Sequence, residues 1–387
     1  MHTLCLNAGS SSIKFAVYGG QGDDLTRQLR GAIDGIGQEH GRAWLKDADG
    51  RMLEDARGEF ADHAAGIRVL LDQFHERVRH VDAIGHRVVH GGRELTQPTV
   101  VDDQVLEELR DVAPFAPLHV PHQIAVIEAV RQQYPKLPQV TCFDTAFHRR
   151  MPVLARRFPL PDEYWERGLE KYGFHGLSYE YITRRHPEAV AGRTIIAHLG
   201  NGASLAAVRD GEPVETTMGF TPTGGIVMST RTGDIDPGVL LYLMRTENLA
   251  SDDVDRLVNR SAGLLGVSGL SSDMQTLLNV EGENESARLA VELFCYHARR
   301  HIGALAAVLG GLDQIVFTAG IGEHAAEIRR RICVELGWLG VEFDEERNAG
   351  HAPIITRDGS RCRVHVIPTN EEWMIARHVG ELVRLEA

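Results

Sequence analysis

Short apolar runs separated by small residues occur at two distant places in the chain. Residues 4–7 and 13–18 are predicted to form strands joined by the turn AGSSS, and residues 195–199 and 204–208 repeat this arrangement around GNGA. The stretches NAGSSSIKFAV and LGNGASLAAV align with their Gly-x-Ser elements in register. Two interpretations fit this pattern: a chance similarity of Gly-rich hairpins, or duplication of a whole domain that begins with this hairpin.

Between these hairpins the apolar period changes from two residues to about 3.6, the period of an amphipathic helix. The clearest case is residues 63–78, where Ile67, Leu70, Leu71 and Phe74 fall on one face. Further helices are predicted at residues 105–112, 124–130, 289–309 and 371–385. Because strands and helices are mixed along the chain, we expect an α/β fold.

Length adds a prediction about domains. The chain has 387 residues, which is more than one hydrophobic core usually organises. A typical length of about 150 residues per domain favours two domains. Residues 146–161 have the composition of a segment that passes from one domain to the next. Pro152, Pro159 and Pro161 interrupt the apolar periodicity there, and several arginines keep the segment polar. The final helix, residues 371–385, is expected to return to the first domain.

Composition narrows the functional classes. The formal net charge is −13, and the longest basic run is RRR at residues 329–331, which argues against duplex nucleic acid as a partner. An anionic substrate must then be attracted by a few local cations. The five cysteines form no CxxC pair, so neither a disulfide framework nor a zinc site is expected. No apolar window reaches 18 residues and no signal peptide is recognisable, so we expect a cytoplasmic protein.

The first Gly-rich turn carries candidate chemistry. Asn7, Ser10, Ser12 and Lys14 bring an amide, hydroxyls and one cation to a place where a phosphate could approach the backbone. A Ser-rich turn without further function explains the same residues. No GxxxxGK[ST] motif is present, so this is not a Walker A loop.

Three charged or titratable residues stand out in apolar surroundings. Arg87 lies in a strand-like run within GHRVVHGG, and a buried charge needs either a structural partner or a function. Asp144 follows a predicted strand within TCFDTAFH, at a strand end where open α/β sheets place their sites. His175 lies within YGFHGLS. Taken singly, a salt bridge explains Arg87 as well as a functional role does, and a lone histidine in apolar surroundings is more often a satisfied core residue than a catalyst.

Two further Gly-rich turns and one polar loop complete the candidates. HLGNG at residues 198–202 and AGIGE at residues 319–323 are read as turns that leave strands, the second leading into a helix at residues 325–334, and both suit a phosphate or a nucleoside. In MSTRTGDIDPG a single loop holds Arg231, Asp234 and Asp236.

Taken together, these motifs resemble the acetate and propionate kinase family in order and from end to end. The matching segments are LNAGSSSIK, GHRVVHGG, FDTAFH, YGFHG, HLGNGASL, MGFTP, TRTGDIDPG, GLLGVSGLSSDM, FTAGIGE and PTNEE. The resemblance implies two duplicated ribonuclease-H-like domains of the actin, sugar kinase and Hsp70 type with a nucleotide cleft between them. The N-terminal domain would be residues 1–147 plus 372–387, and the nucleotide-binding C-terminal domain residues 148–371.

The resemblance also assigns site residues by position. The catalytic set would be Arg87, Asp144, His175 and Arg231, with Asn7 and Glu371 near Mg²⁺ or Mn²⁺. The acid would contact Arg87 and an apolar lining of Val89, Leu118, Phe174 and Pro222. ATP would contact Lys14, His198, Leu199, Gly200, Asn201, Gly202, Asp273, Met274, Gln275, Gly320, Ile321, Gly322, Glu323 and His324.

Several positions depart from the family pattern. Val120 and Gln275 stand where the family has Asn and Arg, His324 where it has Asn, and Leu177 and Tyr179 replace Thr and His. Residues 223–225 read Thr-Gly-Gly in place of Leu-Glu-Gly. The reaction type is therefore better supported than the preferred acid or nucleotide.

The resemblance implies reversible, direct in-line transfer of the γ-phosphoryl group from ATP to acetate. The protein is expected to be a cytoplasmic homodimer that serves acetyl-CoA biosynthesis. Neither nucleic acid nor a membrane is expected as a partner. Two alternatives stay open. The same site would suit a propionate or butyrate kinase, and the fold would also suit an actin-like or Hsp70-like ATPase whose output is a conformation.

Overall fold

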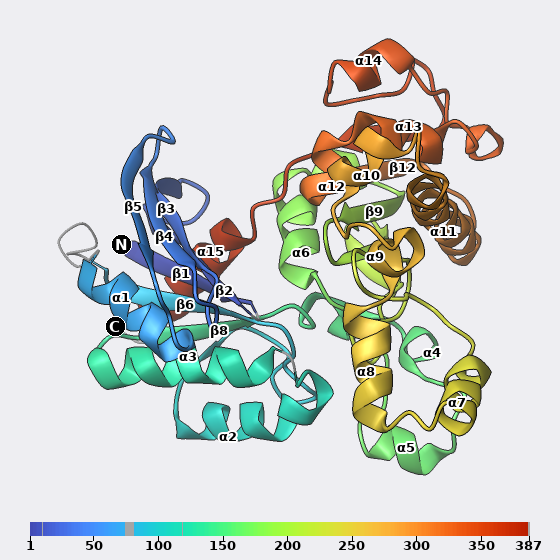
Figure 1. Cartoon of the computed structure of the whole chain (residues 1–387). Helices are drawn as coiled ribbons and strands as arrows, with labels where there is room; N and C mark the ends of the chain where they lie inside the picture. Colours follow the sequence, from blue (N-terminus) through green and yellow to red (C-terminus); the bar gives the residue numbers. More distant parts are fainter. Residues whose placement is uncertain (10, 74–80, 118, 386–387) are drawn as a thin grey trace. The chain divides into compact units, whose positions relative to one another are not determined.

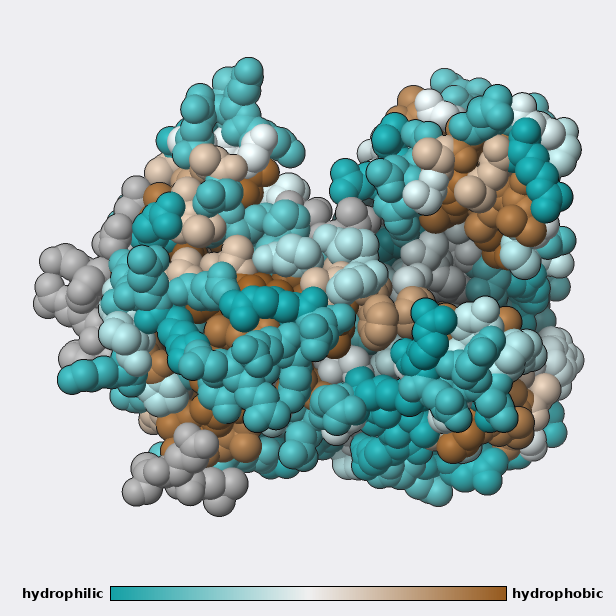
Figure 2. Space-filling model, turned by 90° about the horizontal axis from the view of Figure 1, so that it is seen from below, coloured by the Kyte–Doolittle hydropathy of each residue, from teal (hydrophilic) through white to brown (hydrophobic). Residues whose placement is uncertain are grey.

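The chain forms two compact units (Figure 1). Unit 1 contains Met1–Arg149 and Asn370–Ala387, and unit 2 contains Arg150–Thr369. The computed structural model describes every residue except 10, 74–80, 118 and 386–387. In the described part of the chain, no helix is both long and apolar enough to cross a membrane. On the face drawn in Figure 2, hydrophilic residues cover most of the surface and hydrophobic ones form separate patches.

Unit 1 is built on one mixed sheet with the strand order β5-β4-β3-β2-β1-β6-β8-β7. Strands β1 to β5 form an antiparallel meander, whereas β6 and β8 run parallel to β1. The bounds are β1 His2–Ala8, β2 Ser12–Gly19, β3 Thr26–Asp34, β4 Gly41–Asp47, β5 Met52–Gly58, β6 Ala83–Val88, β7 Thr99–Val100 and β8 Gln139–Phe143.

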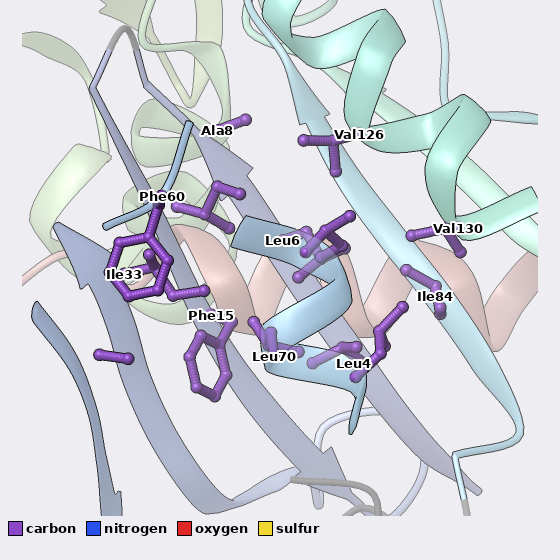
Figure 3. Close-up of a cluster of buried hydrophobic side chains, with 14 of the residues drawn as sticks. Leu4, Leu6, Ala8, Phe15, Ile33, Phe60, Leu70, Ile84, Val126 and Val130 are labelled. Atoms are coloured by element: carbon purple, nitrogen blue, oxygen red, sulfur yellow. The ribbon is translucent and has the colours of Figure 1, made fainter. Parts of the chain in front are cut away.

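Helices cover both faces of this sheet. Leu4 and Leu6 of β1 point into a core shared with α1 (His63–Gln73) and α3 (Val120–Gln133), as Figure 3 shows. The alternate residues of the same strand face α15 (Glu371–Leu385), where the Cys5 Sγ donates to the Glu372 carbonyl oxygen at 3.2 Å. Helix α15 lies so close that a Cβ on Gly85 would be 2.2 Å from Ile375 Cγ2. The predicted return of the final helix to the first unit is therefore confirmed.

Unit 2 repeats the central topology of unit 1. Its sheet has the order β11-β10-β9-β12-β13, with an antiparallel hairpin followed by two parallel strands, as in β3-β2-β1-β6-β8. The two hairpins aligned by sequence are β1–β2 and β9–β10, which occupy equivalent places. Duplication of a domain is therefore the correct interpretation. The bounds are β9 Arg193–Leu199, β10 Ala203–Arg209, β11 Glu212–Thr216, β12 Gln314–Thr318 and β13 Arg363–Val366.

The other helices are distributed over both units. Unit 1 also contains α2 Asp103–Val112. Unit 2 contains α4 Val153–Arg156, α5 Asp162–Glu166, α6 Gly176–Arg185, α7 Pro237–Thr246, α8 Ser251–Arg260, α9 Gly263–Ser268, α10 Met274–Val280, α11 Glu285–Leu309, α12 Ala319–His324, α13 Ala326–Cys333 and α14 Glu345–Ala349. Short 3₁₀ turns lie at Ala113–Phe115, Phe147–Arg150, Pro187–Val190 and Gly337–Leu339.

Most sequence-predicted elements match these bounds, with one difference of kind. The predicted turn at residues 319–323 is itself a helix, α12, because the Glu323 carboxylate accepts the Ala319 N–H at 2.8 Å and closes its first turn. The predicted helix at residues 63–78 is α1, and its last five residues lie outside the described part of the chain. All five cysteines are buried and free, as expected.

Candidate active site

Arg87 is the centre of a polar cluster in unit 1. Its guanidinium forms a fork on Asp144, with Nε to Oδ1 at 2.8 Å and Nη2 to Oδ2 at 2.6 Å. Nη1 donates to the Asn7 amide oxygen at 3.2 Å, and a Glu371 carboxylate oxygen lies 3.7 Å from Nε. Asp144 is buried, whereas the Arg87 side chain keeps 17% of its surface exposed. The salt bridge expected for a buried arginine is present, and the cation still reaches the surface.

The strand register places these side chains together. Asn7 and Arg87 are the last paired residues of the parallel strands β1 and β6, and their side chains share the sheet face that carries α15. Asp144 directly follows β8, with its N–H bonded to the Val88 carbonyl oxygen at 3.0 Å. Glu371 is the first residue of α15. The cluster thus lies at the carboxyl ends of three parallel strands, where the sequence placed Asp144.

The electrostatics of this cluster are dominated by carboxylates. Burial lowers the pKa of Arg87, but Asp144 and Glu371 raise it more, so the guanidinium stays charged. Burial raises the pKa of Glu372, and the neighbouring Glu371 raises it further. Among the described residues, no group of three His, Cys, Asp or Glu side chains is arranged to hold a metal. The Asn7 and Glu371 oxygens nevertheless suit Mg²⁺, which uses one or two carboxylates and completes its shell with water and phosphate.

His175 belongs to a hydrogen-bonded network in unit 2. It precedes α6 with φ +59°, a left-handed conformation that is strained for a non-glycine residue. Its Nδ1 lies 2.8 Å from the Ser204 hydroxyl, which also lies 2.5 Å from the Tyr179 hydroxyl. The ring stacks on His198 with centroids 4.1 Å apart. Tyr179 is therefore part of the network that orients His175, a role that its departure from the family pattern did not reveal.

Arg231 lies beside His175 in the same unit. A Cβ on Gly202 would be 3.3 Å from His175 Nε2 and 3.4 Å from Arg231 Nη1, so both side chains converge on this glycine. Nη1 of Arg231 donates to the Pro222 carbonyl oxygen at 3.1 Å. The two acids of the Arg231 loop have structural partners, because Asp234 accepts the Gly225 N–H and Asp236 accepts the Gly238 N–H, each at 2.7 Å.

A pocket of about 220 Å³ collects many of the predicted nucleotide residues of unit 2. It is lined by Gly200, Asn201, Asp273, Met274, Gln275, Leu278, Gly320, Ile321, His324 and Ala325. Leu278 and Ala325 also line the pocket and were not predicted from the sequence. Leu278 follows Met274 by one helical turn of α10, and this spacing was the available signal.

The remaining predicted nucleotide residues lie elsewhere. His198 stacks on His175, and Glu323 caps α12 and accepts the Thr369 N–H at 3.1 Å. Leu199, Gly202 and Gly322 flank the lining in the chain. Lys14 belongs to unit 1, on β2, and is exposed.

The predicted acyl-binding residues are divided between the units. Val89 follows β6 in unit 1 and is 7% exposed. Phe174 and Pro222 belong to unit 2, where Phe174 is fully buried and Pro222 is partly exposed. Leu118 lies outside the described residues.

Comparisons with known proteins agree over almost the whole chain. A family model described as the acetokinase family matches residues 2–377. An acetate kinase of Rhodopseudomonas palustris is 46% identical over 98% of each chain, and one of Methylocella silvestris is 44% identical over 98% of this chain and 97% of its own. The solved acetate kinase of Porphyromonas gingivalis has a TM-score of 0.89 at 33% identity over 99% of each chain. A propionate kinase of Francisella tularensis has a TM-score of 0.91 at 33% identity, covering 97% of this chain and 98% of its own.

Proposed function

Because the chain belongs to the acetokinase family, we propose that it transfers the γ-phosphoryl group of ATP to acetate, forming acetyl phosphate and ADP, and catalyses the reverse reaction. The observation that carries the proposal is the Arg87 fork at the strand ends of unit 1. A guanidinium held on one edge by a buried carboxylate presents its other edge in a fixed orientation to a planar anion.

The number of donors on Arg87 supports this role. A guanidinium has five N–H groups, and the bonds to Asp144 and Asn7 use three of them. Within the described part of the chain, the other two N–H groups form no hydrogen bond, which leaves them for an acetate carboxylate or a transferring phosphoryl group. Asp144 is then an orienting residue, since its carboxylate is already committed to Arg87.

No general base is needed in the proposed reaction. A carboxylic acid with a pKa well below 7 is already ionised, so the attacking oxygen carries its charge before it reacts. The obstacle is repulsion between two anions, and phosphoryl transfer depends mainly on positioning and charge stabilisation. We assign charge stabilisation to Arg87 and Arg231, and a hydrogen bond to the phosphoryl oxygens to His175.

Asn7 and Glu371 would hold Mg²⁺ or Mn²⁺, since both supply the oxygen ligands that such ions prefer. When bound, the ion shields negative charge on the nucleotide phosphates. The pocket between α10 and α12 is the proposed nucleotide site of unit 2. We further propose that the protein acts in the cytoplasm as a homodimer and serves acetyl-CoA formation.

One observation supports a second candidate, a propionate or butyrate kinase. The Francisella tularensis propionate kinase has the same fold at a TM-score of 0.91, so the fold does not select the acid. The choice would rest on the apolar residues Val89, Phe174, Pro222 and Leu118. An ATPase switch of the actin or Hsp70 type is the less favoured candidate, since it has no use for two arginines directed at an anion.

Trapping of acyl phosphate by hydroxylamine tests the proposal. Purified protein, MgATP and acetate, propionate or butyrate should give a hydroxamate, with acetate at least as good a substrate as the others. ATP hydrolysis without hydroxamate from any of the three acids would instead support the ATPase switch. Hydroxamate from propionate or butyrate but not from acetate would support the second candidate.

A further inference from the structure

A buried glutamine lies between two strand ends of unit 1 and takes no direct part in the cluster around Arg87. Gln123 belongs to α3 and is 2% exposed. Its Oε1 accepts the Val89 N–H at 3.1 Å, and its Nε2 donates to the Ala8 carbonyl oxygen at 3.3 Å. Ala8 ends β1, and Val89 directly follows β6.

These two bonds replace a bond of the sheet. The parallel ladder of β1 and β6 ends at the pair Asn7 and Arg87, and its next step would join the Val89 N–H directly to the Ala8 carbonyl oxygen. The side-chain amide of Gln123 has the donor and the acceptor of a peptide group, and it bonds to both partners. The strands therefore separate at the residue that follows Asn7, while the Val89 N–H and the Ala8 carbonyl oxygen both keep a hydrogen-bond partner.

The separation occurs where the candidate site is built. Arg87 Nη1 donates to the Asn7 side chain at 3.2 Å, one step before the inserted amide, and Val89 follows one step after it. We propose that Gln123 is a positioning residue that sets the distance between the ends of β1 and β6. It would thereby set the placement of Arg87 and Val89 toward the carboxylate substrate and of Asn7 toward the proposed ion. The kinetic part of this proposal rests on the proposed acetate kinase activity.

Two variants test the inserted amide. Gln123→Met keeps the approximate size of the side chain but removes both bonds. The thioether is then no longer held between the strands and can turn away, so the strands should close and form the direct bond from Val89 N–H to the Ala8 carbonyl oxygen. Gln123→Glu is isosteric. When protonated it donates to Ala8 and accepts from Val89 as glutamine does, and when ionised it faces the Ala8 carbonyl oxygen with a second acceptor. Burial favours the neutral carboxyl, so this variant should work well at low pH and poorly at high pH.

Gln139 provides a matched control. It is also a buried glutamine of unit 1, 4% exposed, but it lies at the amino end of β8, where its Oε1 lies 2.7 Å from His86 Nε2. Gln139→Met should lower the thermal midpoint without changing the kinetic constants. Gln123→Met should raise the KM for acetate about tenfold or more, since a displacement on the order of 1 Å can reduce a rate by about 10²-fold. The KM for ATP should rise less than that for acetate, since the proposed nucleotide pocket belongs to unit 2 and this strand end would affect ATP only through the ion proposed at Asn7.

The decisive experiment combines kinetics with crystal structures of Gln123→Met and the wild type. We expect a direct Val89–Ala8 bond in the variant, a selective rise in the KM for acetate, and for Gln123→Glu a loss of kcat/KM from pH 6 to 9 that the wild type lacks.

Unchanged strand separation in the variant structure would overturn the proposal even if the wild type makes no acyl phosphate. An active wild type together with Gln123 variants that only lose stability, as Gln139→Met does, would also overturn it. If Gln123→Met does not fold, the pH profile of Gln123→Glu decides, and a profile parallel to that of the wild type counts against the role. A wild type without hydroxamate from any acid refutes the proposed function alone.

Discussion

At the scale of single residues, the cation proposed to bind the substrate is also a partner in a buried ion pair. The sequence alone made a salt bridge and a substrate-binding role of Arg87 equally plausible. The two hydrogen bonds of its guanidinium to Asp144 show that the ion pair exists. A buried pair is weak support for stability, because desolvation offsets much of the attraction. Fixing the direction of the guanidinium is the better explanation, since two N–H groups remain for an anion.

The fork leads to a first prediction. Arg87→Lys and Arg231→Lys should each lower kcat by about 10²-fold, because an ammonium supplies charge but not paired parallel donors. Hydroxamate formation measures the effect. Arg42→Lys is the matched control, since Arg42 makes the same fork on Asp55 at the surface, with both bonds at 2.8 Å, and its loss should leave kcat unchanged. Near-normal turnover of both active-site variants would show that net charge suffices.

Val89 supports a second prediction at this scale. Val89→Ala should shift kcat/KM toward propionate and butyrate relative to acetate by roughly tenfold, which is within the range of one methylene-sized difference. Val88→Ala is the control, because Val88 is fully buried in the separate core beneath α2 and α3 and should reduce stability without changing the ratio. An unchanged ratio in Val89→Ala would transfer the choice of acid to the segments around Val120 or Thr223.

At the scale of elements, periodicity predicted most strands and helices, and the exceptions have local physical causes. Helix α3 begins at Val120, four residues before its predicted start, because Pro121 fits the first turn of a helix. Helix α12 was read as a turn because two of its first four residues are glycine, a poor helix former, and the capping Glu323 cannot be recognised without coordinates.

The site was less accessible to sequence reasoning than the elements. Arg87 and Asp144 were both selected, but their pairing depends on the register of β6 and β8 over a separation of 57 residues. Gln123 and Tyr179 were missed as partners, since a polar residue in a helix normally faces water. The resemblance to a family supplied residue roles that spacing alone could not.

The cap of α12 gives an element-scale prediction. Glu323→Ala leaves the Ala319 and Thr369 N–H groups without this acceptor, which should cost about 1–3 kcal/mol of stability. Because Gly320 and Ile321 belong to α12 and line the pocket, the KM for ATP should rise while that for acetate changes little. Glu323→Gln keeps a carbonyl acceptor and should be milder, and Glu335→Ala at an exposed site is the control. Equal KM values in both Glu323 variants and the wild type would separate the cap from nucleotide binding.

At the scale of the whole molecule, one strand order has been used twice for different chemistry. Unit 1 places a guanidinium among carboxylates at its strand ends, whereas unit 2 places stacked histidines and a pocket lined mainly by uncharged residues. Both units also keep a buried His–Gln pair between their last two parallel strands. His86 of β6 lies 2.7 Å from Gln139 of β8, and His365 of β13 lies 2.8 Å from Gln314 of β12.

These paired histidines predict how the molecule responds to acid. Burial lowers the pKa of His86 to about 4, and burial together with Arg363 lowers that of His365 to about 4. A histidine in the unfolded chain has a pKa near 6.5. Below that pH the unfolded chain therefore binds protons at these two rings, whereas the folded chain does not bind them until the pH approaches 4. The stability that the neutral rings contribute is therefore complete above about pH 6.5 and is lost as the pH falls toward 4. For the fully buried His86, the loss amounts to about 3 kcal/mol over that interval.

Urea midpoints measured from pH 8 to 4.5 test this assignment. His86→Gln keeps an amide donor toward Gln139 but cannot titrate, so its stability should fall less steeply below pH 6.5 than that of the wild type, whatever its stability at pH 8. His365→Gln should behave in the same way in unit 2, and the double variant should be the least sensitive to acid. Carboxyl groups also titrate in this range. The comparison is therefore between the slopes of urea midpoint against pH for each variant and for the wild type. Parallel curves for all four proteins would mean that the two rings bind protons equally in the folded and the unfolded chain, and that acid destabilises the fold through its carboxylates alone.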